Sequence, residues 1–90
     1  MERMILKTFQ YKVKDALGLH ARPAGLLVKC ATSCDSDITI ELSGKTANAK
    51  RLFAVMGLGV KQDDEIQFTV TGAAEEADSA KLKDFCEQNF

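Results

Sequence analysis

No apolar run in this 90-residue chain approaches the roughly 20 residues that a membrane-spanning helix requires. The first residues, from Met1 to Lys7, mix charged and apolar side chains too closely to form the core of a signal peptide. The formal net charge is only -1, so we expect no general attraction to nucleic acid or to an anionic membrane. These absences predict a protein that stays in the cytosol and inserts into no membrane.

Cysteines are few, and their number is odd. Cys30 and Cys34 are four residues apart, while Cys86 is remote from both. Side chains at that spacing share a helix face, so a metal shared by Cys30 and Cys34 is one alternative. No second cluster or nearby histidine completes a zinc site, however. We therefore expect free, partly buried thiols in a reducing compartment and no metal.

The single histidine and the single proline lie together, between a strand-like segment and a helix-like one. Pro23 suits a first helical turn, where its missing N–H costs nothing, and Gly18 allows a sharp bend before it. The open N–H groups of a helix N-terminus favour an anion, and the Arg22 guanidinium adds donors for phosphate oxygens. The pattern suits an imidazole, His20, that contacts or carries a phosphoryl group. The alternative is a histidine that only ends the helix or hydrogen-bonds at the edge of the core.

Hydrophobic periodicity predicts seven elements along the rest of the chain. Alternation of apolar and polar residues predicts four strands, over residues 5–14, 37–42, 46–49 and 65–71. Apolar residues three and four apart predict three helices, over residues 21 to about 32, 50–56 and about 75 to 90. Ser43-Gly44-Lys45 is typical of a hairpin turn, and the second helix is expected to end before Gly57.

Each predicted strand has one apolar face, and helices must cover that face. The inward positions of the last strand, for example, are Ile66, Phe68 and Val70. We therefore predict a single domain over residues 1–90 with an α+β fold, an open-faced β-sandwich. The chain contains no internal repeat, low-complexity tract or linker.

The seven residues Gly18-Leu19-His20-Ala21-Arg22-Pro23-Ala24 resemble the active-site signature of HPr, and the resemblance covers nearly the whole chain. HPr is the histidine-containing phosphocarrier family of the bacterial phosphoenolpyruvate:sugar phosphotransferase system. The resemblance implies a four-stranded antiparallel sheet covered on one face by three helices. It also implies that His20 accepts a phosphoryl group on Nδ1 from phosphorylated enzyme I and passes it to the IIA domain of a sugar permease. Such a carrier takes part in phosphotransfer without turnover of its own, and no cofactor is expected.

The resemblance also implies which groups assist His20. The backbone N–H groups of Ala21 and Arg22 would stabilise the phosphoryl group, and the Arg22 side chain would balance charge in the complexes. An apolar patch with a basic rim would dock the partners. The matching apolar residues are Leu52, Phe53 and Met56, and the basic ones are Lys29, Lys50 and Arg51. The alternative places Leu52, Val55 and Met56 in the core, and we expect a split in which Phe53 is the most exposed.

Two positions depart from the family pattern. Arg51 stands where many Gram-positive members have a serine that a kinase phosphorylates, so that switch is absent or uses another residue. Leu17 stands where sugar-branch members of enteric bacteria often have asparagine, and it is closer to the nitrogen-branch paralogues.

We expect a monomeric sugar-branch phosphocarrier. The alternatives are a nitrogen-branch phosphocarrier, a regulatory binding module in which His20 is not stably phosphorylated, and a metal carrier that uses Cys30 and Cys34.

Overall fold

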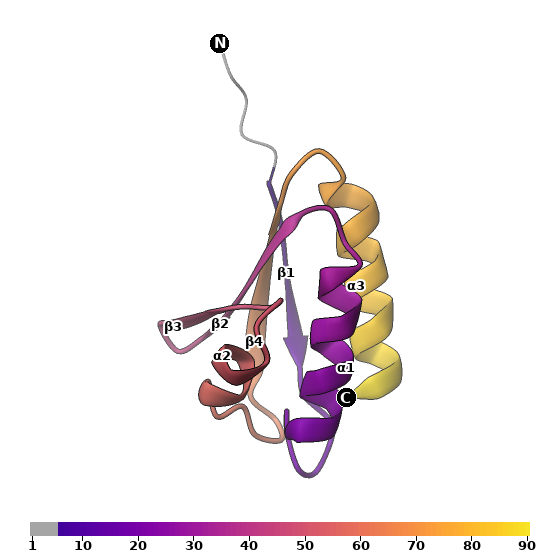
Figure 1. Cartoon of the computed structure of the whole chain (residues 1–90). Helices are drawn as coiled ribbons and strands as arrows, with labels where there is room; N and C mark the ends of the chain where they lie inside the picture. The colour runs from indigo at the N-terminus through magenta and orange to yellow at the C-terminus, as the bar shows by residue number, and fades with distance from the viewer. Residues whose placement is uncertain (1–5) are drawn as a thin grey trace.

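The computed structural model describes residues 6–90 and contains the seven elements in the predicted order (Figure 1). The four strands are β1 (Leu6–Lys12), β2 (Asp37–Leu42), β3 (Lys45–Asn48) and β4 (Glu65–Thr71). The three helices are α1 (Ala21–Thr32), α2 (Leu52–Gly57) and α3 (Glu75–Asn89). The predicted starts of the first and third helices are therefore confirmed.

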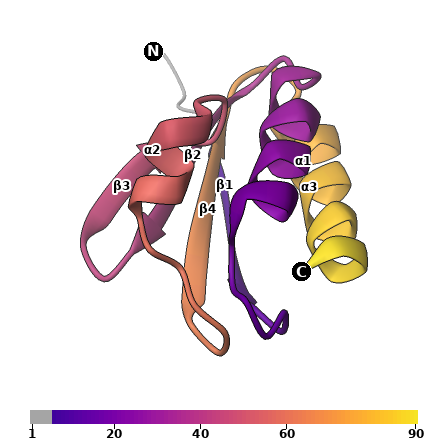
Figure 2. The same ribbon diagram turned by 60° about the horizontal axis from the view of Figure 1, so that its bottom comes forward.

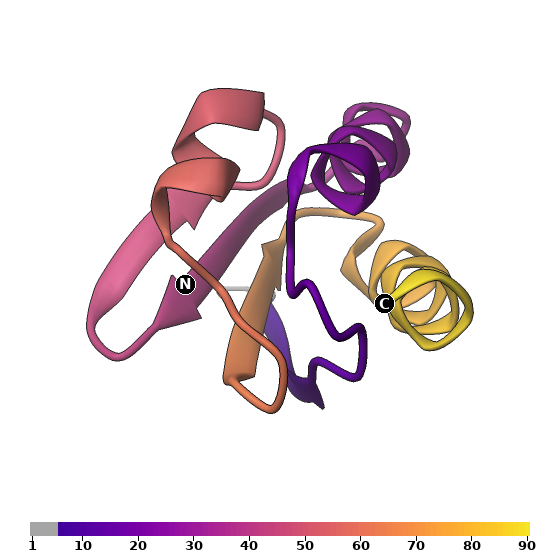
Figure 3. The same cartoon turned by 90° about the horizontal axis from the view of Figure 1, so that it is seen from below.

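The strands form one sheet in the order β1-β4-β2-β3, and every neighbouring pair is antiparallel. Figure 2 shows α2 over the β2–β3 side of the sheet and α1 with α3 over the β1 side. Seen from below, the three helices gather on one side of the sheet, with α1 between α2 and α3 (Figure 3). The predicted fold, an α+β open-faced sandwich with three helices on one face, is confirmed.

Strand β4 has neighbours on both sides and supplies the centre of the core. Its predicted inward residues, Ile66, Phe68 and Val70, are all fully buried. Phe68 lies opposite Phe9 of β1, and the two rings stack with their centroids 4.9 Å apart. Burial of side chains of this size supplies most of the free energy that holds a small domain together, at about 1.5–3 kcal/mol each.

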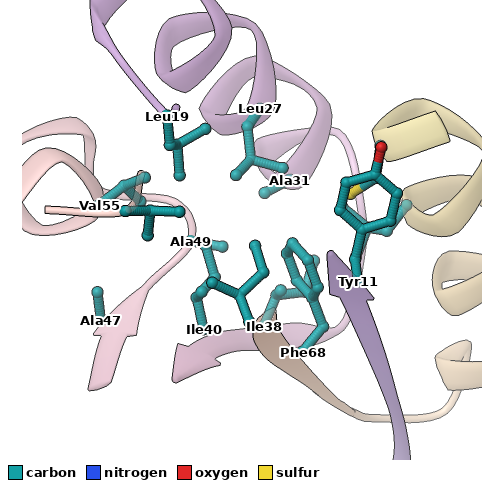
Figure 4. Packing of buried hydrophobic residues seen from close by; sticks show 14 of the residues in the cluster. Tyr11, Leu19, Leu27, Ala31, Ile38, Ile40, Ala47, Ala49, Val55 and Phe68 are labelled. Atoms are coloured by element: carbon teal, nitrogen blue, oxygen red, sulfur yellow. The ribbon is translucent and has the colours of Figure 1, made fainter. Parts of the chain in front are cut away.

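The core also anchors the segment that precedes α1. Leu19, Leu27 and Val55 point from the helical layer toward the sheet residues Ile38, Ile40 and Phe68 (Figure 4). Leu19 is buried although it lies outside any helix or strand. Because Leu19 is fixed in the core, the next residue, His20, is fixed at its margin.

The first strand is shorter than predicted. It ends at Lys12 and not at residue 14, because the antiparallel ladder stops where β4 begins. Asp63, just before β4, has a φ of 73°, and its N–H donates to the Val13 carbonyl at 2.8 Å across the loop. Ile5, the first residue of the predicted strand, lies outside the described residues.

The hairpin and the second helix also differ from prediction by one or two residues. Ser43 and Gly44 both have positive φ, 51° and 86°, which is the two-residue turn of a tight hairpin. Strand β3 therefore begins at Lys45, one residue early. Helix α2 begins at Leu52 and not at residue 50, because the Asn48 side-chain oxygen accepts the N–H of Lys50 and holds a turn there. It also includes Gly57, which was predicted to lie beyond its end.

One acid on α3 is part of the core boundary. Asp78 is buried, and its Oδ2 accepts the backbone N–H of Ser36 at 2.9 Å, which ties α3 to the segment before β2. The pKa of Asp78 is lowered most by the nearby Ser36 hydroxyl, which has no hydrogen-bond partner of good geometry. The hydrogen bond from the Ser36 N–H lowers this pKa further. The carboxylate is therefore held in its charged form in the folded chain.

Asp78→Asn is expected to reduce the free energy of unfolding at pH 7 by about 1–2 kcal/mol, because a charged acceptor becomes a neutral one. The folded pKa of Asp78 lies below its unfolded value of about 3.9, so its stabilisation is present above that pH and is lost as the pH falls through the folded pKa. Urea titrations from pH 7 to pH 2 should show a shallower acid decline for the variant. Glu87→Gln, which removes an exposed carboxylate on the same helix, is the control; an equal decline for Asp78→Asn and the unchanged chain would refute the assignment.

Candidate functional site

A tight loop over residues 15–18 leads the chain into the site. The Asp15 carbonyl accepts the Gly18 N–H at 2.9 Å, and the Leu19 N–H donates to the Val60 carbonyl at 3.1 Å. Gly18 has a φ of 69°, and a Cβ there would overlap the Val60 carbonyl oxygen. The predicted sharp bend at Gly18 is confirmed, and only glycine fits it.

His20 is the residue that caps the N-terminus of α1. Its backbone is extended, with φ -83° and ψ -174°, and its carbonyl accepts the first helical hydrogen bond, from Ala24 N–H at 2.9 Å. Its side chain makes no capping hydrogen bond and is 34% exposed. The imidazole is therefore open to a ligand and is not consumed in holding the helix.

The first turn of α1 has backbone donors to offer that ligand. The first N–H groups of a helix have no partner within it. Here the first three residues are Ala21, Arg22 and Pro23, and proline has no N–H. The open donors are therefore those of Ala21 and Arg22, the two residues that the sequence singled out. They lie at the positive end of the helix dipole, which favours an anion.

A surface cavity of about 280 Å³ lies beside His20. It has ample room for a phosphoryl group and is lined by polar and apolar side chains from three parts of the chain: Asp15, His20, Arg22, Pro23, Leu26, Gln88 and Asn89. The structure thus brings His20 and Arg22 together, as expected. It also adds Gln88 and Asn89 from the end of α3, which no sequence pattern indicated.

The candidate docking residues on α2 divide as expected. Phe53 is 85% exposed and Met56 38%, whereas Leu52 is half-buried and Val55 is fully buried. Helix α2 contacts α1, so these exposed apolar side chains lie on the helix next to the one that begins at His20. Two further exposed apolar residues, Leu17 and Leu26, lie in the loop and in α1 itself.

The candidate basic residues are distributed less compactly. Arg51 is exposed and precedes the first turn of α2. Lys29 is exposed but lies in the last turn of α1, about 13 Å along the axis from His20. The Lys50 ammonium donates to the Cys34 carbonyl at 3.2 Å, also near the end of α1. Of these basic residues and Arg22, Arg22 therefore lies nearest to the start of α1 and Arg51 nearest to the start of α2.

The three cysteines are free thiols. Burial is the main cause that raises the pKa of Cys34 to about 11, and burial also raises the pKa values of Cys30 and Cys86. Protonated thiols are poor metal ligands. Within residues 6–90, no group of three or more His, Cys, Asp or Glu side chains is placed to hold a metal ion.

The sequence matches the family model described as the PTS HPr component phosphorylation site over residues 7–88. The chain belongs to the HPr phosphocarrier family. The match includes residues 18–24, the segment that resembles the HPr active-site signature, and the predicted family is confirmed.

Solved HPr structures agree with this assignment. HPr from Thermoanaerobacter tengcongensis is 37% identical, with 93% of this chain and 94% of that chain covered and a TM-score of 0.88. HPr from Bacillus anthracis is 33% identical, with 90% and 96% covered and a TM-score of 0.84. The catabolite repression protein Crh of Bacillus subtilis, a domain-swapped, intertwined dimer, is 32% identical, with 89% and 92% covered and a TM-score of 0.74. The HPr fold thus occurs in both carriers and a regulatory relative.

The part of the chain from residue 6 onward contains no helix long and apolar enough to cross a bilayer.

Proposed function

We propose that this HPr-family chain is a cytosolic, monomeric phosphocarrier that takes a phosphoryl group from phosphorylated enzyme I onto Nδ1 of His20 and delivers it to IIA domains of sugar permeases. One observation carries the proposal: the His20 side chain makes no capping bond and opens onto a cavity at the N-terminus of α1. A histidine needed only for capping or packing would be hydrogen-bonded to the helix backbone or buried in the core. The His20 side chain is partly exposed and makes no such bond.

The geometry supports reversible transfer. As the Nδ1 lone pair forms a bond to phosphorus, the bond from phosphorus to the donor breaks and its electron pair returns to the donor. The N–H groups of Ala21 and Arg22 offset the charge of the bound group without a metal ion. Two open amides on a half-exposed site stabilise the product moderately, and moderate stabilisation lets the group leave again for the acceptor.

Incubation with phosphoenolpyruvate and catalytic enzyme I tests the proposal. We expect one phosphoryl group per chain, labile in acid and stable in base, and its loss when a sugar-branch IIA domain is added. Loss only to a nitrogen-branch IIA domain would favour the alternative that the exposed Leu17 suggests. No incorporation from any donor would refute the carrier and leave the alternative of a regulatory binding module.

Arg22→Ala is expected to slow phosphoryl transfer about tenfold, because a guanidinium that lines the cavity no longer balances the charge of the moving group. The free energy of unfolding should change by less than about 0.5 kcal/mol, since the side chain is exposed. Quench-flow measurement of transfer from enzyme I checks the rate. Lys83→Ala, which removes an exposed cation from α3, should leave it unchanged; equal rates for Arg22→Ala and the unchanged chain would remove Arg22 from the site.

Phe53→Glu is expected to weaken the binding of enzyme I about tenfold or more, because it places a charge in the centre of the proposed apolar patch. The side chain is 85% exposed, so the free chain should keep its stability. Titration calorimetry with enzyme I measures the affinity. Thr46→Glu, an equally new charge on the exposed edge of β3, is the matched control. If both variants bind with the original affinity, Phe53 lies outside the interface.

A further inference from the structure

Asp15 faces the candidate phosphoacceptor from the loop that precedes α1. Its Oδ2 lies 3.8 Å from Nε2 of His20, and the two side chains are 32% and 34% exposed. Its other oxygen, Oδ1, accepts the Leu17 N–H at 2.8 Å. The carboxylate therefore does two things at once: one oxygen closes the turn and the other lies toward the imidazole.

The backbone of Asp15 is fixed by hydrogen bonds on both sides. Its N–H donates to the Phe90 carbonyl at 3.1 Å, and its own carbonyl accepts the Gly18 N–H at 2.9 Å. Phe90 is itself buried and packs edge-on against Tyr11 and Phe85. The Asp15 backbone, from which the carboxylate extends, is thus anchored to the core through the buried Phe90.

No other charged group competes for this carboxylate at close range. Among residues 6–90, the contacts within 4.0 Å between a basic side-chain nitrogen and a carboxylate oxygen are Lys7–Glu76 and His20–Asp15, so Arg22 is not paired with Asp15. Gln88 and Asn89 also line the cavity, but their amide groups donate to Asp84 and to the Phe85 carbonyl. Asp15 therefore provides the acceptor on the Nε2 side of the ring.

We propose that Asp15 is a positioning residue: it holds His20 as the tautomer that carries its proton on Nε2 and so presents the Nδ1 lone pair to the phosphoryl group. The proposal rests on the proposed function for its link to phosphotransfer. A neutral imidazole has one donor and one acceptor nitrogen, and a carboxylate beside Nε2 favours the donor there. The hydrogen bond from the Leu17 N–H to Oδ1 of Asp15 keeps the carboxylate from rotating away from His20.

The same contact acts during the reaction. When the Nδ1 lone pair forms the bond to phosphorus, the proton stays on Nε2 and the ring gains positive charge. The donor keeps the electron pair of the bond that breaks. The Asp15 carboxylate then faces the new charge, and a contact of 3.8 Å in the free chain, longer than a hydrogen bond, shortens as the attraction grows. When the group leaves, the charge disappears and the ring returns to the same tautomer.

Asp15→Asn is the decisive variant, because the asparagine oxygen still accepts the Leu17 N–H while its NH₂ group faces Nε2 as a donor. The ¹⁵N chemical shifts of His20 report which ring nitrogen carries the proton. We expect an Nε2–H tautomer in the unchanged chain and a clear rise of the Nδ1–H tautomer in Asp15→Asn, with the amide spectrum of α1 preserved. Phosphoryl transfer should slow by about threefold to fivefold, the size of one half-exposed charge contact.

Asp15→Glu should restore part of the Nε2–H population, because it returns the charge. Unchanged ¹⁵N shifts in Asp15→Asn would overturn the proposal, and so would altered shifts with an unchanged transfer rate. If the unchanged chain accepts no phosphoryl group, the proposed function fails instead, and the ¹⁵N shifts alone still decide whether Asp15 sets the tautomer.

Discussion

His20→Ala is expected to incorporate no phosphoryl group under conditions in which the unchanged chain incorporates one. The reason is chemical, since no other imidazole exists in the chain and the cavity lining offers no second nitrogen nucleophile. Mass spectrometry after incubation with phosphoenolpyruvate and enzyme I measures the outcome. A labelled alanine variant would show that the phosphoryl group goes elsewhere.

The fold supplies a control that separates chemistry from stability. The His20 side chain makes no capping bond, so its removal should cost α1 less than about 0.5 kcal/mol. His20→Asn goes further, because asparagine is a preferred N-cap and should stabilise the chain by up to about 1 kcal/mol. A variant that is more stable and yet unlabelled would tie the loss to the imidazole itself. A destabilised His20→Asn would show instead that the ring supports the helix.

The candidate site was predictable where its residues are neighbours in sequence. Gly18, His20 and Arg22 lie within one turn and one helix start, so their spacing alone sets their geometry. Gln88 and Asn89 reach the same cavity from the end of α3, and the bonds from the residues after β1 to the Phe90 carbonyl bring them there. No local pattern encodes such a contact between the two ends of a chain.

The fold was predictable for a similar reason. Strand β4 has a period of two with large apolar residues, and periodicity of this kind specifies both the element and its inward face. The predicted start of α2 was wrong because the Asn48 side-chain oxygen accepts the Lys50 N–H, and this turn keeps Lys50 and Arg51 out of the helix. No sequence pattern indicated that Asp78 of α3 is buried. An acid that is buried against a backbone N–H has the same letter as one in solvent.

Gly18→Ala is expected to reduce the free energy of unfolding by about 3 kcal/mol and to slow phosphoryl transfer. A positive φ costs a non-glycine residue about 1–2 kcal/mol, and Gly18 has a φ of 69°. The added Cβ would also overlap the Val60 carbonyl and lie 2.7 Å from Lys61 Cα, so the loop must move away from its anchor. Since the loop holds both Asp15 and His20, their contact should be lost with it. Chemical denaturation measures the first effect and quench-flow the second.

Two other glycines separate the causes of that expected loss. Gly59 has nearly the same φ, 68°, but a Cβ there meets nothing within 4 Å, so Gly59→Ala should show the backbone cost alone, about 1 kcal/mol. Gly25 lies inside α1 with open space around it, and Gly25→Ala should stabilise the chain by about 0.5–1 kcal/mol. A Gly18→Ala chain no less stable than Gly59→Ala would mean that the loop yields without strain. In that case the close approach to Val60 does not fix the position of His20, and the cavity beside it owes its shape to α1 and the end of α3 alone.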